Sequence, residues 1–105
     1  MKIGFANKKV EKLCTKSSDA LKEFGNYKIV KNLAELMLDL EYTEHMQDFY
    51  VKPMLKRYRV HELTGNKKGL TSLRIDYSYR MTLTVEVKIQ EDEITIMEVS
   101  KHYGE

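Results

Sequence analysis

The chain has 105 residues and a net charge of +2, so it has the length of one domain, residues 1–105, and a charge too small to identify a partner. Its single cysteine excludes an internal disulfide, and its apolar runs are far shorter than the roughly 18–20 residues needed to cross a bilayer. Without a signal-peptide pattern at its start, the sequence predicts a soluble cytoplasmic protein that has no membrane partner.

The first segments after a short expected strand at Lys2–Phe5 have the spacing of two short helices. Asn7 is suited to cap the first helix, because its side chain can accept a hydrogen bond from the first helical turn. Gly25 is suited to end the second helix, because glycine readily takes the left-handed conformation found there. We interpret Cys14, at helical spacing from Val10, as part of the core.

The clearest helical pattern in the chain begins after Asn26, a second expected cap. Its apolar stripe consists of Ile29, Leu33, Leu36, Met37 and Leu40. A further turn or two is expected over Glu44–Tyr50, before Pro53 disfavours helix at Lys52. His45 lies in this segment without an evident partner, and we interpret it as uninvolved in function.

From Arg57 onward the apolar residues alternate with polar ones, which is typical of strands. The four expected strands are Arg57–Leu63, Leu70–Asp76, Tyr79–Ile89 and Glu93–His102. Because their connections are short and polar, neighbouring strands should pair as antiparallel hairpins. The predicted fold class is α+β, with N-terminal helices packed on a mainly antiparallel sheet of four to five strands.

Alternation assigns the strand residues to two faces of the sheet. Met81 and Leu83 define the core face of the third expected strand, which places Arg80 on the opposite, open face. In the last strand, assigning Met97 and Val99 to the core leaves Ile94 and Ile96 on the open face without an explanation. The residues that this counting gathers on the open face are Arg57, Arg59, His61, Arg74, Arg80 and His102.

This open face is strongly basic. Residues 52–80 hold eight lysines and arginines against two acidic residues, whereas residues 1–51 hold eight of each sign. Arginine binds phosphate oxygens with two hydrogen bonds, and histidine exchanges protons near neutral pH. Such groups suit RNA cleavage, in which the 2′-OH loses a proton, phosphate charge is neutralised and the leaving 5′-oxygen is protonated. A solvated basic surface is the plain alternative.

No spacing in the sequence predicts a metal site or a cofactor site. The acidic run at residues 91–93 has the character of a turn, and Gly65 and Gly69 do not form a phosphate-binding motif because no helix follows them. We therefore expect no metal and no cofactor.

The run RVHELTGNKKGLTSLRI, followed by YRMTLTV and the terminal VSKHYGE, resembles the RelE/ParE superfamily of type II toxin–antitoxin toxins, most closely its HigB and YoeB-like branch. That branch has a pattern close to H-x-L-x-G-x-x-K-G-L-W-S-x-R-I, then an arginine in the next strand and a histidine near the C-terminus. The matching residues are His61, Leu63, Gly65, Lys68, Gly69, Leu70, Ser72, Arg74, Ile75, Arg80, His102 and Tyr103. The chain departs from the pattern at Thr71, where tryptophan is common, and at Ser100 and Lys101, where Asp-Tyr is common.

The resemblance implies a RelE-like fold and a ribosome-dependent mRNA endonuclease, or mRNA interferase. Such a hydrolase cuts messenger RNA in the A site of the 70S ribosome without a metal, inhibits translation, and is silenced by a cognate antitoxin protein of the helix-turn-helix class. It implies catalytic roles for His61 and His102 in proton transfer, for Arg80 at the scissile phosphate, and for Tyr103 in stacking on or protonating the substrate. The expected RNA-binding residues are Arg57, Arg59, Lys67, Lys68 and Arg74.

Two other functions remain open at the level of sequence. One is a non-enzymatic ParE-like toxin that binds DNA gyrase, and the other is a ribosome- or RNA-binding module without catalysis. The fold alone does not separate these functions from RNA cleavage. The presence of His61, Arg80 and His102 favours cleavage, because ParE-like toxins generally lack this set of residues.

Overall fold

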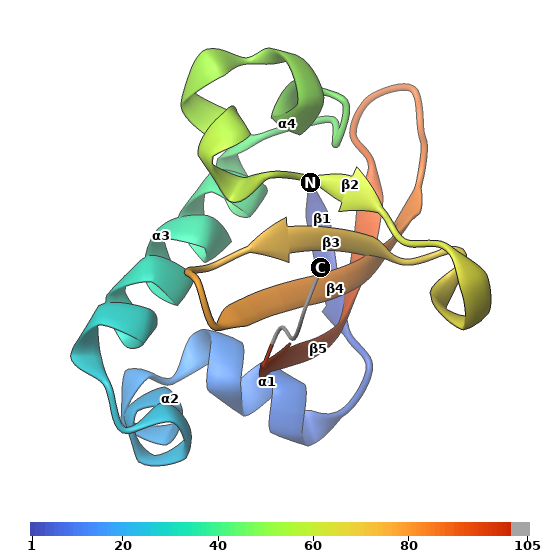
Figure 1. The fold of residues 1–105 in the computed structure, drawn as a ribbon. Coiled ribbons are helices and arrows are strands. Elements are labelled where there is room, and N and C mark those ends of the chain that lie inside the picture. Colours follow the sequence, from blue (N-terminus) through green and yellow to red (C-terminus); the bar gives the residue numbers. More distant parts are fainter. Residues whose placement is uncertain (102–105) are drawn as a thin grey trace.

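The computed structural model describes residues 1–101, which form one mixed five-stranded sheet covered by helices (Figure 1). The strands are β1 (Lys2–Phe5), β2 (His61–Glu62), β3 (Thr71–Arg74), β4 (Tyr79–Glu86) and β5 (Glu93–Lys101), in the spatial order β1-β5-β4-β3-β2. β1 pairs with β5 in parallel, and the other three pairs are antiparallel. The structure confirms the predicted α+β class and the short first strand.

The helices of the N-terminal half include the three predicted caps, Asn7, Gly25 and Asn26. They are α1 (Lys8–Thr15), α2 (Ser17–Phe24), α3 (Tyr27–Tyr42) and α4 (Asp48–Val51), followed by the 3₁₀ helices η1 (Pro53–Tyr58) and η2 (Gly65–Lys67). The Oδ1 atom of Asn7 accepts a hydrogen bond from the backbone of Val10 at 2.9 Å, and that of Asn26 accepts one from Lys28 at 2.8 Å. Gly25 ends α2 with a φ of 63°, where a side chain would be strained.

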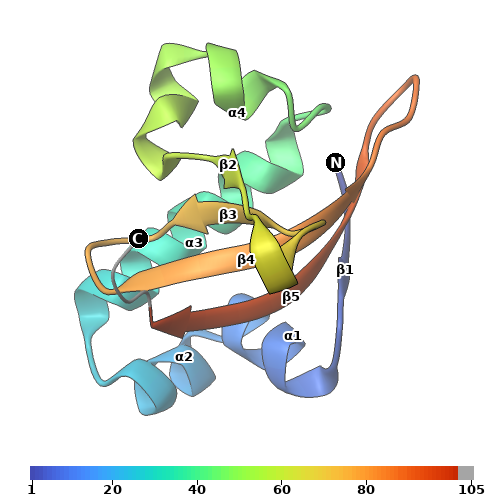
Figure 2. The same cartoon turned by 45° about the vertical axis from the view of Figure 1, so that its right-hand side comes forward.

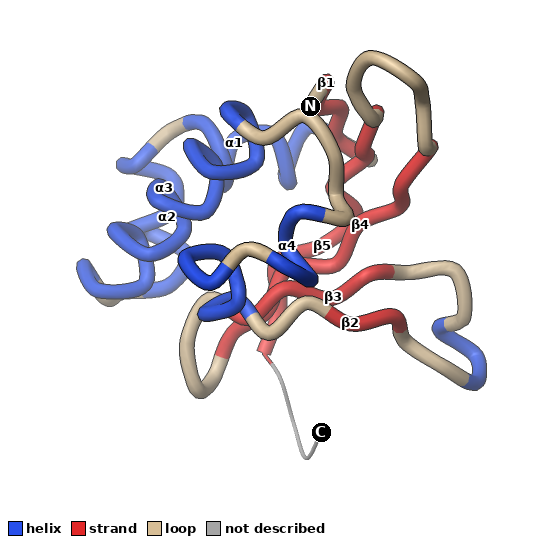
Figure 3. Tube along the Cα trace, turned by 90° about the horizontal axis from the view of Figure 1, so that it is seen from above, coloured by secondary structure: helices blue, strands red, loops and turns tan. Residues whose placement is uncertain are grey.

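Helices α1–α3 lie together along one side of the sheet (Figures 2 and 3). The predicted stripe of α3 supplies Ile29, Leu33, Leu36 and Leu40, all buried against sheet residues such as Leu73, Met81 and Leu83. Burial of this continuous apolar face holds the helices on the sheet. Among residues 1–101, no helix has the length and apolar character required to span a membrane.

The half-buried Cys14 packs against the same core, as predicted. Burial raises the pKa of its thiol to about 12, so the reactive thiolate is nearly absent at neutral pH. Packing is therefore the role that the structure supports for Cys14.

The prediction that Ile94 and Ile96 face away from the core is wrong. Thr82 pairs with Glu98, but the next residue, Leu83, pairs with Ile96, so Met97 is an extra residue in β5. This β-bulge reverses the alternation within one strand. Ile94 and Ile96 are buried before the bulge, whereas Met97 is 37% exposed.

The predicted strand over Arg57–Leu63 is also wrong for most of its length. Pro53 starts η1 instead, a position where the missing N–H of proline is harmless, and only His61–Glu62 forms a strand. Between them Arg59 takes a φ of 46°, which turns the chain sharply. β4 stops at Glu86, three residues before the predicted end of this strand at Ile89, and Val87 and Ile89 are exposed.

Asp92, in the connection between β4 and β5, links this connection to two segments that are distant in sequence, residues 45–46 and β1. Its Oδ2 accepts a hydrogen bond from the backbone of Met46 at 2.8 Å, and its Oδ1 accepts one from the backbone of Lys88 at 3.0 Å. His45 Nδ1 lies 3.2 Å from Oδ1, so the expectation that His45 has no partner is wrong. The backbone oxygen of Asp92 also accepts a hydrogen bond from Lys2 in β1 at 3.0 Å.

The hydrogen bonds to Asp92 determine its protonation state. Burial of the side chain acts to raise its pKa, but the hydrogen bonds from Lys88, Met46 and His45 outweigh burial and hold the pKa below its usual value. Asp92 is therefore a charged group in the interior, with an exposed fraction of only 2%.

Candidate functional site

A hollow of about 460 Å³ opens between the loop that follows β2 and the ends of β4 and β5. Its lining residues are His61, Glu62, Leu63, Thr64, Asn66, Lys67, Arg80 and Lys101. Three of the predicted site residues, His61, Lys67 and Arg80, therefore come together from β2, η2 and β4. We refer to this feature as the His61–Arg80 hollow.

The strand register explains why these residues share one face. His61 pairs with Ser72, and Ser72 in turn pairs with Thr82, which makes one row across the sheet. Directly paired residues point to the same face. The next row contains Arg74, Arg80 and Ser100, which confirms the predicted placement of both arginines on the face of His61 and puts them beside one another.

Arg80 lies on the predicted face, but it is only 7% exposed. Ser72 and Thr82, next to it in the sheet, are also buried, so polar side chains form the floor under the site. Sequence reasoning missed this floor because serine and threonine in strands are common on solvated surfaces. A guanidinium in partly desolvated surroundings attracts an anion more strongly than one in bulk water.

His61 is exposed, and a hydrogen bond to its own turn fixes its ring. Nδ1 lies 3.0 Å from the backbone oxygen of Arg59. Because a carbonyl oxygen only accepts hydrogen bonds, Nδ1 carries the hydrogen in this contact. The neutral ring then has its lone pair on Nε2, the atom able to take a proton from a ligand.

The predictions that Arg57 and Arg59 lie on the open sheet face are wrong. Arg57, in η1, turns to α3, where Nη2 lies 3.1 Å from Asp39 Oδ2 and Nη1 lies 3.6 Å from Glu35 Oε2. Its guanidinium also stacks on the ring of Tyr58 at 4.7 Å. Arg59 is an exposed residue at the end of η1. The break in the expected strand removes both residues from the alternation on which their placement depended.

The remaining predicted residues have different positions. Lys67 lines the His61–Arg80 hollow, whereas the adjacent Lys68 is exposed and lies outside its lining. Lys101 lines the hollow from the end of β5, and sequence reasoning treated it only as a departure from the family pattern. His102 and Tyr103 lie outside the described residues, so their roles remain predictions.

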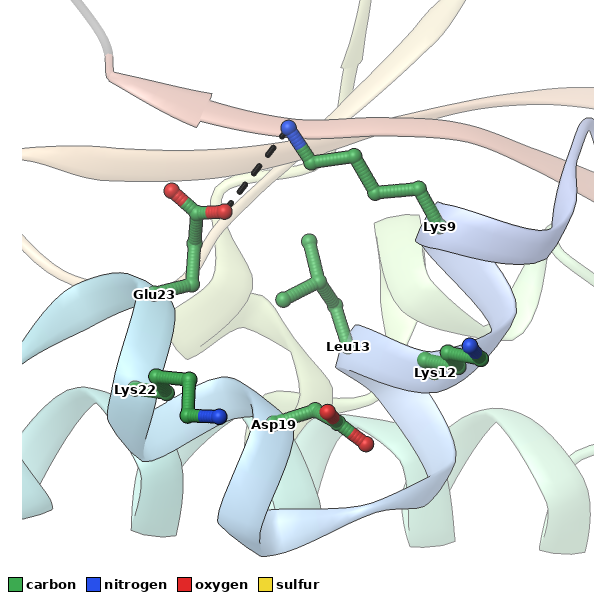
Figure 4. Close-up of a pocket in the computed structure, with 6 residues that line it drawn as sticks. All are labelled: Lys9, Lys12, Leu13, Asp19, Lys22 and Glu23. Atoms are coloured by element: carbon green, nitrogen blue, oxygen red, sulfur yellow. Dashed lines mark ion pairs between the residues drawn. The ribbon is translucent and has the colours of Figure 1, made fainter.

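A second hollow lies between α1 and α2, on a different part of the surface (Figure 4). It is lined by Lys9, Lys12, Leu13, Asp19, Lys22 and Glu23. Lys9 Nζ lies 3.7 Å from Glu23 Oε1. Together with Asp19, Glu23 offsets much of the positive charge that the three lysines bring to this hollow. Without a histidine in its lining, this hollow does not offer the proton-transfer group of the first one. Within residues 1–101, no cluster of three or more His, Cys, Asp or Glu residues is arranged to hold a metal ion.

Solved structures of toxins resemble the chain over nearly its whole length. A YoeB/ParE toxin from Agrobacterium tumefaciens has a TM-score of 0.62 and 16% identity, covering 98% of this chain and 100% of that chain. A YafQ mutant from E. coli has a TM-score of 0.63 and 14% identity, covering 98% of both chains. A YoeB–YefM complex from Staphylococcus aureus has a TM-score of 0.54 and 21% identity, also covering 98% of both chains.

No protein-family model and no curated protein matches the sequence. At the identities of the solved structures, the likeness establishes the fold. It confirms the RelE-like fold predicted from the sequence.

Proposed function

We propose that this chain is the toxin of a toxin–antitoxin system and acts as a ribosome-dependent mRNA endonuclease. The observation that carries the proposal is the His61–Arg80 hollow, which joins a proton-transfer group to a buried cation in the fold of the YoeB and YafQ toxins. The YoeB–YefM complex supports a cognate antitoxin as the partner, for which we propose the helix-turn-helix class.

The geometry supports a division of roles in cleavage. His61 Nε2 takes the proton of a ribose 2′-OH, and the resulting 2′-oxygen attacks the adjacent phosphorus. Arg80 neutralises the charge that develops on the phosphate oxygens. The bond from phosphorus to the 5′-oxygen breaks, and a general acid, for which we propose His102, protonates that oxygen. The products are a 2′,3′-cyclic phosphate and a 5′-hydroxyl. The proposed reaction requires neither an oxidant nor a metal ion.

Primer extension on a reporter message after brief induction of the protein tests this function. We expect new 5′ ends within the translated region, and we expect them to disappear when the start codon of the message is removed. Growth arrest without cleaved message would instead favour a binding toxin of the gyrase type. Equal cleavage of free RNA with and without ribosomes would contradict the ribosome dependence.

Lys67 and Lys68 offer a matched pair for testing RNA contact at the hollow. Lys67→Ala should weaken binding to a non-cleavable 2′-O-methyl oligoribonucleotide about fivefold, equivalent to about 1 kcal/mol, because one phosphate contact is lost. It should also reduce the slope of log affinity against log salt by about 0.7. Lys68→Ala should have a smaller effect on both quantities, since Lys68 lies outside the lining. Fluorescence anisotropy at several salt concentrations measures both variants, and equal losses would exclude a specific role for Lys67.

A further inference from the structure

The turn between β3 and β4 carries an exposed aromatic ring stacked on an arginine. Tyr77 is 86% exposed, and the guanidinium carbon of Arg74 lies 4.7 Å from the centre of its ring. The structure also stacks Arg57 on a tyrosine, but that ring belongs to Tyr58, which is buried in the core. Tyr77 thus combines a supporting cation with a ring surface that is open to a ligand.

Hydrogen bonds hold this turn in one conformation. Asp76 Oδ1 accepts hydrogen bonds from the backbones of Ser78 and Tyr79, each at 2.8 Å. Arg74 Nε donates to the backbone oxygen of Asp76 at 3.2 Å, which anchors the guanidinium beneath Tyr77. The ring and its arginine are therefore positioned before any ligand arrives, which reduces the entropy lost on binding.

The same arginine connects the turn to the His61–Arg80 hollow. Arg74 pairs directly with Arg80 across β3 and β4, and paired residues lie on one face about 5 Å apart. The row of His61 lies two residues further along the strands, a rise of about 7 Å. Going along the sheet, the order is His61, then Arg80 with Arg74, then Tyr77.

We propose that Tyr77, supported by Arg74, is a stacking site for one base of the bound RNA, next to the phosphate held at Arg80. The proposal rests on the proposed function for the identity of the ligand as RNA. Every base has a π face, and stacking on an aromatic side chain contributes about 1–3 kcal/mol per base without requiring a particular sequence. The site adds a base contact to the phosphate contacts of the hollow and places it on a rigid turn.

Binding of a 2′-O-methyl oligoribonucleotide, measured by fluorescence anisotropy, tests the stacking site. Tyr77→Ala should weaken binding by about 5- to 150-fold, whereas Tyr77→Phe should bind within about twofold of the wild type, because the ring and not the hydroxyl stacks. Tyr42→Ala is a control, since Tyr42 is 81% exposed on α3, a helix that contributes no residue to the lining of the hollow. An abasic oligonucleotide of the same length should bind the wild type and Tyr77→Ala equally.

An unchanged affinity of Tyr77→Ala for the base-containing oligonucleotide would overturn the proposal, as would no binding by the wild type. A loss of equal size on the abasic oligonucleotide would also overturn it, because the ring would then act on the backbone or on the fold. Reduced neutralisation by the antitoxin with unchanged RNA binding would identify Tyr77 as a protein contact instead. Failure of the proposed function is distinguishable, because message cleavage would be absent while the base-dependent binding through Tyr77 persisted.

Discussion

Arg80→Ala is expected to lower message cleavage by about 10²–10³-fold and to abolish growth arrest on induction. Arg80 is the buried cation of the His61–Arg80 hollow, and in the proposed reaction its charge opposes the negative charge of the transition state. Removing one preorganised group of this kind typically costs about 10²–10³-fold in rate. Primer extension on a reporter message and growth after induction measure the two effects.

Arg80→Lys separates charge from geometry. Lysine keeps the positive charge but cannot hold two phosphate oxygens in the planar arrangement of a guanidinium, so we expect an intermediate rate. Because Arg80 is buried, thermal unfolding of both variants must accompany the activity measurement. Folded Arg80→Ala protein that cleaves and arrests growth like the wild type would show that the site is wrongly assigned.

Asp92→Asn is expected to lower the free energy of unfolding by about 2–3 kcal/mol at pH 7. The carboxylate receives hydrogen bonds on both oxygens, from Met46 on Oδ2 and from Lys88 on Oδ1. An amide replaces one of these oxygens by an NH₂ group, which cannot accept a hydrogen bond and faces a donor. Urea unfolding followed by circular dichroism measures the loss, which is large beside the total stability of a small domain.

The effect of Asp92→Asn should depend on pH in a defined direction. The folded pKa of Asp92 lies below its unfolded value of 3.8, so its charge stabilises the fold above about pH 4 and loses that effect as the pH falls through the folded pKa. The difference between wild type and variant should therefore shrink as the pH falls below about 4. Glu86→Gln is the control, because the carboxylate of Glu86, near the same connection, is 71% exposed and should contribute little. A pH-independent difference would assign the stabilisation to packing.

The parts of the fold that depend on local sequence could be predicted from it. Asn7, Gly25 and Asn26 act on the residues next to them, and the stripe of α3 is a regular repeat, so all four were recognisable. Alternation also placed Arg74 and Arg80 correctly, because β3 and β4 pair without interruption between them. Local rules thus sufficed wherever the partner residues followed a regular register.

The errors arose where a long-range interaction or an irregularity decided the structure. The bulge at Met97 divides β5 into two alternating patterns, and counting from one end assigns the other end to the wrong face. Arg57 bonds to Asp39 on α3, a partner that no local pattern indicates. Lys101, which lines the hollow, and Tyr77, the proposed stacking residue, were missed because strand ends and turns carry such residues routinely on ordinary surfaces.

The parallel pair of β1 and β5 has a consequence for synthesis of the protein. Lys2 of β1 pairs with Glu93 of β5, so β1, the first strand to be synthesised, cannot pair within the sheet until β5 has been made. Contacts between such distant segments form late, because closing a long loop loses chain entropy before any pairing compensates it. The nascent chain therefore lacks a finished sheet until β5 has emerged from the exit tunnel, and the His61–Arg80 hollow, which Lys101 of β5 helps to line, is incomplete until then.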